Sequence, residues 1–143
     1  LIKKNIVEAD EKETSKRKVL NLGHTFAHAY EASLNYSKKL NHGEAVILGI
    51  KAASKFSLFN KILNNKDFQL IVDHLNKLKL KSDVNDLFLK SDLNKILSFM
   101  RKDKKNIARE INLVLLRKIG LPVYKLQFSE KKISSFLKKE LIK

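Results

Sequence analysis

The sequence predicts a mainly helical fold with one short β-hairpin near residues 111–127. Several segments repeat apolar residues at three- and four-residue spacing without an interrupting proline, which is the pattern of amphipathic helices. One stretch differs: INLVLLRKIGLPVYKLQF is rich in Val, Ile, Leu and Tyr around Gly120 and Pro122, as expected for two strands joined at a turn. The 143 residues contain no repeat and no linker rich in Pro, Gly or Ser, so a single domain over residues 1–143 is expected.

The N-terminal part of the chain is expected to begin with an extended segment and to continue as a helix. Residues 1–9 are β-prone around Ile6 and Val7. The charged stretch DEKETSKR then leads into a segment with helical period from about Lys16 to Leu34. This segment is interpreted as one continuous helix.

Further helices are expected beyond a polar connection, NYSKKLNHG. Asn41, followed three residues later by Glu44, resembles a capping box for a helix over 44–59. That helix is apolar on most of its circumference in its first turns, so it should be buried there. Ser129 is a natural N-cap for the last helix. The remaining amphipathic segments fall at 66–78, 92–102 and 129–141.

The composition excludes some classes of function for this chain. No apolar run approaches the length of about 18 residues that a membrane-spanning helix needs, and the N-terminus lacks the pattern of a secretory signal. A soluble, cytoplasmic protein without a membrane partner is therefore expected. Cysteine is absent, which excludes disulfides and thiolate metal sites. Any transition metal would have to be bound by imidazole and carboxylate groups.

The strongly basic charge raises the question of nucleic acid. The formal net charge is +15 at pH 7 and the sequence pI is about 10.0. Only four of the 30 basic residues are arginine, however, and the lysines are scattered over every segment without interleaved aromatic residues. Because surfaces that clamp phosphates or read bases favour arginine forks, no nucleic-acid partner is expected. A lysine-rich solvated surface is the simpler interpretation, and anionic small substrates remain open.

The stretch LNLGHTFAHAYEA carries two histidines four residues apart in an otherwise apolar run. On a helix of about 100° per residue, a polar stripe about 60° wide contains Arg17, Asn21, His24 and His28. The opposite side is apolar and is expected to pack on a core: Val19, Leu22, Phe26 and Ala29. In this chain, a stripe that simply faces water would be expected to carry Lys and Glu, but this stripe carries Arg, Asn and two His. A functional site is therefore as good an interpretation as a solvated surface. The small residues Gly23 and Ala27 would let another segment approach closely.

Histidines at this spacing can bind one metal ion together. His24 and His28 project side by side, and His42 stands at the start of the next helix. Spacing does not decide which two of the three would be ligands, because one imidazole can instead take an acid/base or phosphate-binding role. His74 is interpreted as an ordinary surface histidine.

Four motifs follow one another in the order found in one enzyme family: KKNIVEADEKETSKRKVLNLGHTFAHAYEA, HGEAVILGI, MRKDKKN and INLVLLRKIG. Together they closely resemble the 3-dehydroquinate synthase family from Lys3 to about Gly120. The resemblance implies the multi-helical C-terminal domain of the dehydroquinate synthase-like fold, which binds metal and substrate. The NAD-binding N-terminal domain of the family, and the helical segment that supplies a glutamate metal ligand, are absent from this sequence. The chain is therefore expected to be a fragment or a separated domain.

The resemblance also implies roles for individual residues. His24 and His42 match the two histidine ligands of a catalytic zinc, whose third ligand would be the absent glutamate. Catalytic roles fall on two further residues: His28 matches a histidine near the substrate phosphate, and Glu13 matches an acidic residue with an acid/base role. Substrate-binding positions of the family match Lys3, Arg17, Leu20, Asn21 and either Lys104 or Lys105. The family usually has glycine where Ala27 stands, and the added methyl group is expected to be tolerated.

The reaction implied by the resemblance converts 3-deoxy-D-arabino-heptulosonate 7-phosphate to 3-dehydroquinate and phosphate in the shikimate pathway of aromatic amino acid biosynthesis. NAD oxidises the substrate transiently, phosphate leaves by β-elimination, and the reduced cofactor then reduces the intermediate again. The ring opens and closes by an intramolecular aldol step. Zinc, with cobalt as an alternative, would act as Lewis acid and template. The full-length enzyme would be a homodimer, and the isolated chain would be inactive. Another sugar phosphate cyclase, a metal-dependent polyol dehydrogenase of similar fold, and a basic non-enzymatic binding module remain as alternatives.

Overall fold

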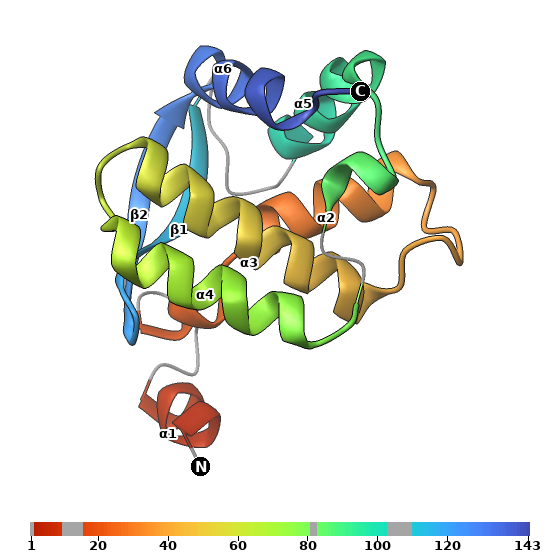
Figure 1. Cartoon of the computed structure of the whole chain (residues 1–143). Helices are drawn as coiled ribbons and strands as arrows, with labels where there is room; N and C mark the ends of the chain where they lie inside the picture. The colour runs from red at the N-terminus through yellow and green to blue at the C-terminus, as the bar shows by residue number, and fades with distance from the viewer. Residues whose placement is uncertain (1, 10–15, 81–82, 103–109) are drawn as a thin grey trace.

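The computed structural model describes residues 2–9, 16–80, 83–102 and 110–143. Within these ranges the fold is mainly helical with one antiparallel hairpin, as the sequence predicts (Figure 1). The α-helices are α1 (Ile2–Ala9), α2 (His24–Ser33), α3 (His42–Phe59), α4 (Asn65–Lys77), α5 (Leu93–Lys102) and α6 (Glu130–Glu140). The other described elements are the 3-10 helices η1 (Lys16–Asn21), η2 (Val84–Asp86) and η3 (Lys90–Asp92), and the strands β1 (Glu110–Lys118) and β2 (Leu121–Ser129).

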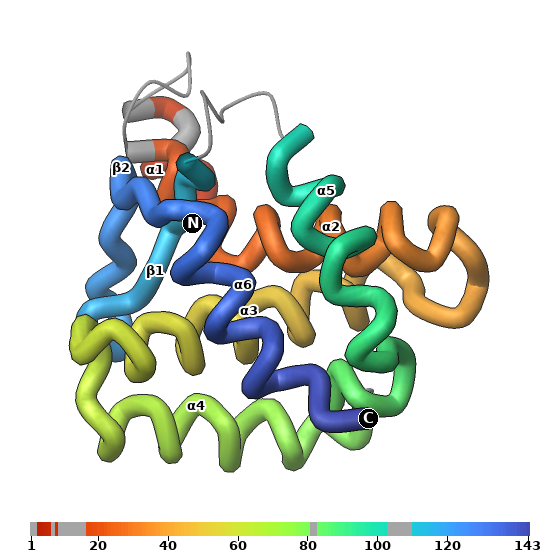
Figure 2. The backbone as a smooth tube through the Cα atoms, turned by 90° about the horizontal axis from the view of Figure 1, so that it is seen from above, coloured from red at the N-terminus to blue at the C-terminus, as the bar shows by residue number. Residues whose placement is uncertain are grey.

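Helix α2 lies at the centre of the molecule. It packs against α3 and α5, while α4 packs on α3 (Figures 1 and 2). The hairpin packs on α3 through β1, and α6 contacts both α5 and β2. Helix α1 contacts η1 and stands away from the body of the fold (Figure 1).

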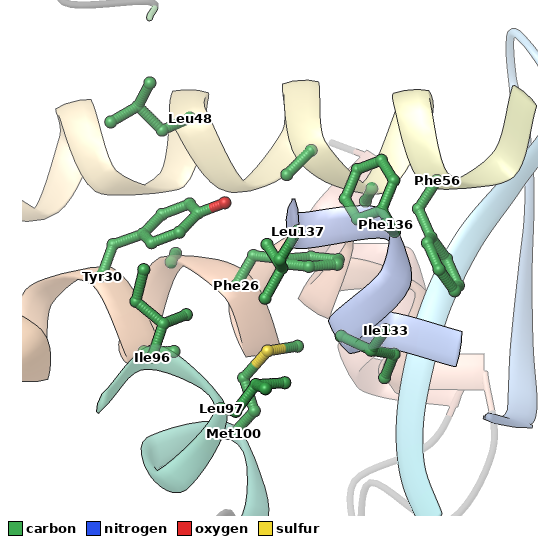
Figure 3. Packing of buried hydrophobic residues seen from close by; sticks show 14 of the residues in the cluster. Phe26, Tyr30, Leu48, Phe56, Ile96, Leu97, Met100, Ile133, Phe136 and Leu137 are labelled. Carbon is green, nitrogen blue, oxygen red and sulfur yellow. The ribbon is translucent and has the colours of Figure 1, made fainter. Parts of the chain in front are cut away.

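The hydrophobic core forms where α2, α3, α5 and α6 meet (Figure 3). The ring centroid of Phe26 on α2 lies 6.3 Å from that of Phe56 on α3 and 6.1 Å from that of Phe136 on α6. The apolar sides of the last two helices add further buried residues: Ile96, Leu97, Met100, Ile133, Leu137 and Leu141. Helix α2 is therefore anchored through its apolar face, which leaves its polar face for other contacts.

Side-chain hydrogen bonds help to hold the hairpin beside α2 and α3. The Leu116 backbone N–H donates to Ser57 Oγ at 3.1 Å, and the buried Ser57 hydroxyl donates to the Ala53 carbonyl at 2.7 Å, which fixes β1 to α3. Thr25 Oγ1 donates to the Asn112 carbonyl at 3.4 Å and joins α2 to β1. One part of the hairpin is thereby held next to the start of α2.

The start of α3 is capped as the sequence predicts. The Glu44 backbone N–H donates to Asn41 Oδ1 at 2.9 Å, and the Asn41 backbone N–H donates to Glu44 Oε2 at 3.1 Å. This capping box places His42 in the first turn of α3.

None of the described helices is both long enough and apolar enough to span a membrane.

The prediction of an extended segment over residues 1–9 is wrong, because Ile2–Ala9 form the helix α1. A helix satisfies its own backbone hydrogen bonds, whereas a strand needs a neighbouring strand, and the described sheet consists of β1 and β2 alone. Lys4 Nζ lies 3.7 Å from Glu8 Oε1, an ion pair at the four-residue spacing that supports a helix. The β-propensity of Ile6 and Val7 is too weak to outweigh these effects.

The prediction of one continuous helix over residues 16–34 is also wrong. The chain forms η1, turns at residues 22–23, and begins α2 at His24. Gly23 has a φ of 78°, a left-handed conformation that a continuing α-helix excludes. The polar stripe is therefore divided between two elements, although the part that follows Gly23 keeps the predicted helical spacing.

Close packing of α2 on α3 accounts for the break. A Cβ on Gly23 would overlap backbone atoms of Gly49 and Ile50 in α3. The predicted close approach of another segment is thus confirmed. Ala27, where the family resemblance implies glycine, is fully buried. It fits because the facing Gly49 has no side chain: a Cβ there would lie 3.0 Å from the Ala27 Cβ.

Two glycine substitutions separate backbone strain from this close contact. Gly23 and Gly120 both have a positive φ, but a Cβ on Gly120 would meet nothing within 4 Å. Gly120→Ala is expected to lower the free energy of unfolding by about 1–2 kcal/mol, through strain alone. Gly23→Ala should cost about 1–3 kcal/mol more, because backbone atoms must also move apart. Urea unfolding measures both values, and equal losses would contradict the proposed cause of the helix break.

Candidate functional site

A polar cavity of about 610 Å³ lies between the histidine-bearing helix and the hairpin. Its helical side is lined by Lys18, Asn21, His24, Thr25 and His28. Its hairpin side is lined by Asn112, Leu113, Val114, Tyr124, Lys125 and Gln127. The volume falls in the range of small-molecule sites, about 300–1,000 Å³. Imidazole, amide, hydroxyl and ammonium groups on the lining can donate hydrogen bonds to an anionic ligand.

Three imidazoles gather on the helical side. The ring centroids of His24 and His28 are 5.6 Å apart, and the His42 centroid lies 6.3 Å from that of His24 and 6.4 Å from that of His28. His24 is half-buried, whereas His28 and His42 are exposed. His42 joins the group because the capped start of α3 packs beside α2. His74 is exposed on α4, as expected of a surface histidine.

The helix break at Gly23 also orients His24. Leu22 precedes the N-cap Gly23, so its carbonyl lies outside the hydrogen-bond ladder of α2. The His24 Nδ1–H donates to this carbonyl at 3.3 Å. Because a carbonyl oxygen only accepts, the neutral ring carries its proton on Nδ1 and keeps its lone pair on Nε2.

His42 is held in the same tautomer by a carboxylate. Its Nδ1–H donates to Glu31 Oε1 at 3.1 Å, and Glu31 Oε2 lies 3.3 Å from the same nitrogen. Glu31 stands near the end of α2, so this contact joins the two helices that carry the three imidazoles. The Nε2 atom of His42 is left with the lone pair.

The electrostatics of the cluster favour a neutral His24. Burial lowers the pKa of the His24 imidazole, and the neighbouring His28 and His42 rings lower it further, against the raising effects of the hydrogen bond to Leu22 and of the Glu31 charge. A pKa below the ordinary value keeps the ring unprotonated at neutral pH. Neutral imidazole is the form that binds a metal ion.

His24 and His42 are two residues that could hold a metal ion. Each keeps a lone pair on Nε2 while its Nδ1–H is tied to a carbonyl or a carboxylate, which is the usual support of a metal-binding histidine. Among the described residues, no group of three His, Asp or Glu side chains could hold a metal ion by itself. A site built on this histidine pair would need a further protein ligand from outside those residues.

The site residues predicted from the sequence fall into separate places. Four lie at or beside the cavity: Asn21, His24, His28 and His42. Arg17 and Leu20 are half-buried on η1 and are not among the lining residues. Lys3 is exposed on α1, also apart from the lining. Three lie outside the described residues: Glu13, Lys104 and Lys105.

Several lining residues do not stand out in the sequence. Lys125 has a φ of 61°, beside a register shift between Leu113 and Leu115, so an irregularity in the hairpin brings it to the cavity. No local pattern relates such a strand residue to a helix far earlier in the chain. Glu31 did offer a signal, because it stands seven residues after His24, two helical turns along the same face.

The fold matches those of two solved synthases. One is 2-deoxy-scyllo-inosose synthase complexed with carbaglucose-6-phosphate, NAD+ and Co2+, with a TM-score of 0.81 and 23% identity over 97% of this chain and 39% of that one. The other is 2-epi-5-epi-valiolone synthase from Streptomyces hygroscopicus with NAD+ and Zn2+ bound, with a TM-score of 0.71 and 20% identity over 93% of this chain and 35% of that one. The chain thus has the fold of a part of these two synthases.

Sequence similarity defines the family more closely. The family model described as 3-dehydroquinate synthase C-terminal matches residues 1–106, and the chain belongs to this family. The 3-dehydroquinate synthase of Pelagibacter ubique is 67% identical over 143 residues, which is 100% of this chain and 39% of the relative. The chain therefore spans about two fifths of the length of that curated relative.

Proposed function

We propose that the chain is the metal- and substrate-binding part of a 3-dehydroquinate synthase, which converts 3-deoxy-D-arabino-heptulosonate 7-phosphate to 3-dehydroquinate and phosphate in the shikimate pathway. The observation that carries the proposal is the group of His24, His28 and His42 beside a polar cavity, in a chain of this family. The name and the 67% identity of the Pelagibacter ubique relative support the same activity.

His24 and His42 would hold a divalent metal ion through their Nε2 atoms. A carboxylate from a part of the enzyme outside this chain would be the third protein ligand, as the family resemblance implies. Bound there, the metal supplies Lewis-acid polarisation and a template for substrate oxygens. Zinc is proposed, with cobalt as an alternative, since the two related synthases were solved with Co2+ and with Zn2+.

The rest of the helical side would bind the phosphate and carboxylate of the substrate. The His28 imidazole, the Asn21 amide and the Lys18 ammonium line the cavity and can donate to anionic oxygens. These donors lie on α2, which packs in the hydrophobic core, and on η1, which contacts both strands of the hairpin, so both elements are in place before the substrate arrives. They can therefore stabilise the charge that develops as phosphate leaves, without having to reorganise.

Other assignments rest on the family resemblance. The acid/base role of Glu13 is one of them. The substrate contacts assigned in this way are Lys3, Arg17, Leu20 and either Lys104 or Lys105. NAD, a separate domain that binds it, a homodimer and a cytoplasmic location belong to the same proposal.

A chimera tests the proposed function. The chain replaces the matching 143 residues of the Pelagibacter ubique relative and so follows that enzyme's own N-terminal part. With NAD and zinc, the chimera is expected to release phosphate from the heptulosonate phosphate and to form 3-dehydroquinate. The chain alone is expected to be inactive, because hydride transfer needs NAD positioned by protein, and no dinucleotide-binding motif occurs in these residues.

Product analysis decides between the enzymes of this fold. A different cyclic product from another sugar phosphate would assign the chain to another cyclase. A folded chimera that binds NAD and zinc but leaves the heptulosonate phosphate unchanged would contradict the proposal. Retention of the chain on DNA in a salt-dependent way, without any zinc binding, would favour a basic binding module instead.

A further inference from the structure

We propose that Glu31 is a positioning residue that sets the tautomer and the orientation of the His42 imidazole for metal binding. The inference rests on the proposed function, in which His42 is a metal ligand. Glu31 would act through His42 rather than by touching the metal or the substrate. It is thus an addition to the residues that the family resemblance implies.

The Glu31 carboxylate is held where this contact needs it. Its side chain is 12% exposed, whereas the side chain of His42 is 63% exposed. A carboxylate removed from water costs free energy unless it is hydrogen-bonded. Both of its oxygens lie within hydrogen-bond distance of His42 Nδ1, at 3.1 Å and 3.3 Å. The more buried partner therefore fixes the more exposed one.

This contact decides which nitrogen of His42 carries the proton. An ionised carboxylate only accepts hydrogen bonds, so Nδ1 must be the donor, and Nε2 keeps the lone pair that a metal needs. A carboxylate on the second nitrogen also makes the ligand more basic, which strengthens metal binding. The Leu22 carbonyl imposes the same tautomer on His24. Both imidazoles therefore present the same nitrogen.

Glu31 lies on the same helix as His24 and contacts His42, so it connects the two imidazoles. It stands seven residues after His24 on the same helix face, and His42 opens α3 directly beyond the connecting loop. The contact between Glu31 and His42 thus ties the start of α3 to the helix that carries His24. Without it, the His42 ring would be free to turn, and metal binding would have to order it.

An experiment on the chain compares Glu31→Ala with the unchanged sequence and with a matched control, Glu44→Gln. Glu44 is a carboxylate two residues from His42 whose Oε2 accepts from the Asn41 backbone, and glutamine preserves that capping box. Long-range proton–nitrogen NMR correlations without metal report the tautomer of His42. Titration with cobalt of the chimera that carries the same substitutions, followed by visible absorption, reports the affinity for metal, because the chimera also supplies the third protein ligand.

In Glu31→Ala, His42 is expected to lose the fixed Nδ1–H tautomer, and the affinity for cobalt is expected to fall by about tenfold or more. Glu31→Gln should retain the tautomer, because its amide oxygen still accepts the hydrogen bond, and should lose less affinity. Glu44→Gln should match the unchanged chain. Glu31→Met fills the same space without an acceptor, so it should behave like alanine and carries the test if alanine unfolds the chain.

An unchanged tautomer or an unchanged cobalt affinity in a folded alanine or methionine variant would overturn the inference and leave the proposed function intact. An equal loss in Glu44→Gln would also overturn it, because it would show a general effect of negative charge near the helix start. Failure of the unchanged chimera to bind cobalt would instead refute the proposed metal site, and the role of Glu31 would fall with it.

Discussion

Replacement of His28 by alanine is expected to lower kcat/KM of the chimera by about 100-fold or more, because it would remove the donor that we propose for the departing phosphate. His28 lines the cavity at a ring separation of 5.6 Å from His24, so it can meet a substrate held by the same cluster. Asn21→Ala should cause a loss of the same order, since Asn21 lines the cavity from the other side of the helix break. Steady-state kinetics with the heptulosonate phosphate give both values.

His74→Ala is the matched control for this prediction. His74 is the fourth histidine of the chain, exposed on α4 and apart from the residues that line the cavity. Its replacement should leave kcat/KM unchanged. Near-normal turnover by a variant that lacks both His28 and Asn21 would show that the polar stripe faces solvent, which is the simpler interpretation of its sequence.

Loss of either His24 or His42 is expected to lower the zinc affinity of the chimera by more than about 100-fold. Changes to groups that merely support a ligand cost about 10–100-fold, and here a ligand itself is removed. The free energy of unfolding without metal should change little, because α2 and α3 are held by their own buried faces. Competition with a chelator of known affinity measures the zinc binding.

The His28→Ala variant is the control for the predicted loss of zinc affinity. His28→Ala should retain zinc affinity while it loses activity, which separates the phosphate role from the metal role. Tight zinc binding that survives alanine at both His24 and His42 would refute the assignment of these two residues as ligands.

Local patterns were sufficient to predict most of the elements. The capping box of Asn41 and Glu44, the apolar stripe of α6 and the turn at Gly120 each depend on residues a few positions apart, and the structure confirms all three. The continuous helix over 16–34 failed for the opposite reason. Its break at Gly23 follows from contact with Gly49, a residue in the next helix that no local pattern connects with it.

The candidate site could likewise be predicted where it depends on local spacing, but not where it depends on tertiary contacts. His24 and His28 share a helix face, which spacing alone predicts, and Asn21 lies close by in the cavity. The hairpin side of the cavity could not be predicted, because Lys125 reaches it through a strand irregularity and through tertiary packing. Spacing also left open which histidines bind metal. The hydrogen bonds to Leu22 and Glu31 that favour His24 and His42 become visible only in three dimensions.

The assignment of the three histidines is tested most directly by the nitrogen signals of their imidazoles during a zinc titration of the chain. The Nε2 signals of His24 and His42 are expected to move together with added zinc, while those of His28 and His74 stay in place. Joint movement of His24 and His28, with His42 unaffected, would contradict this assignment and would make the pair at four-residue spacing the metal site.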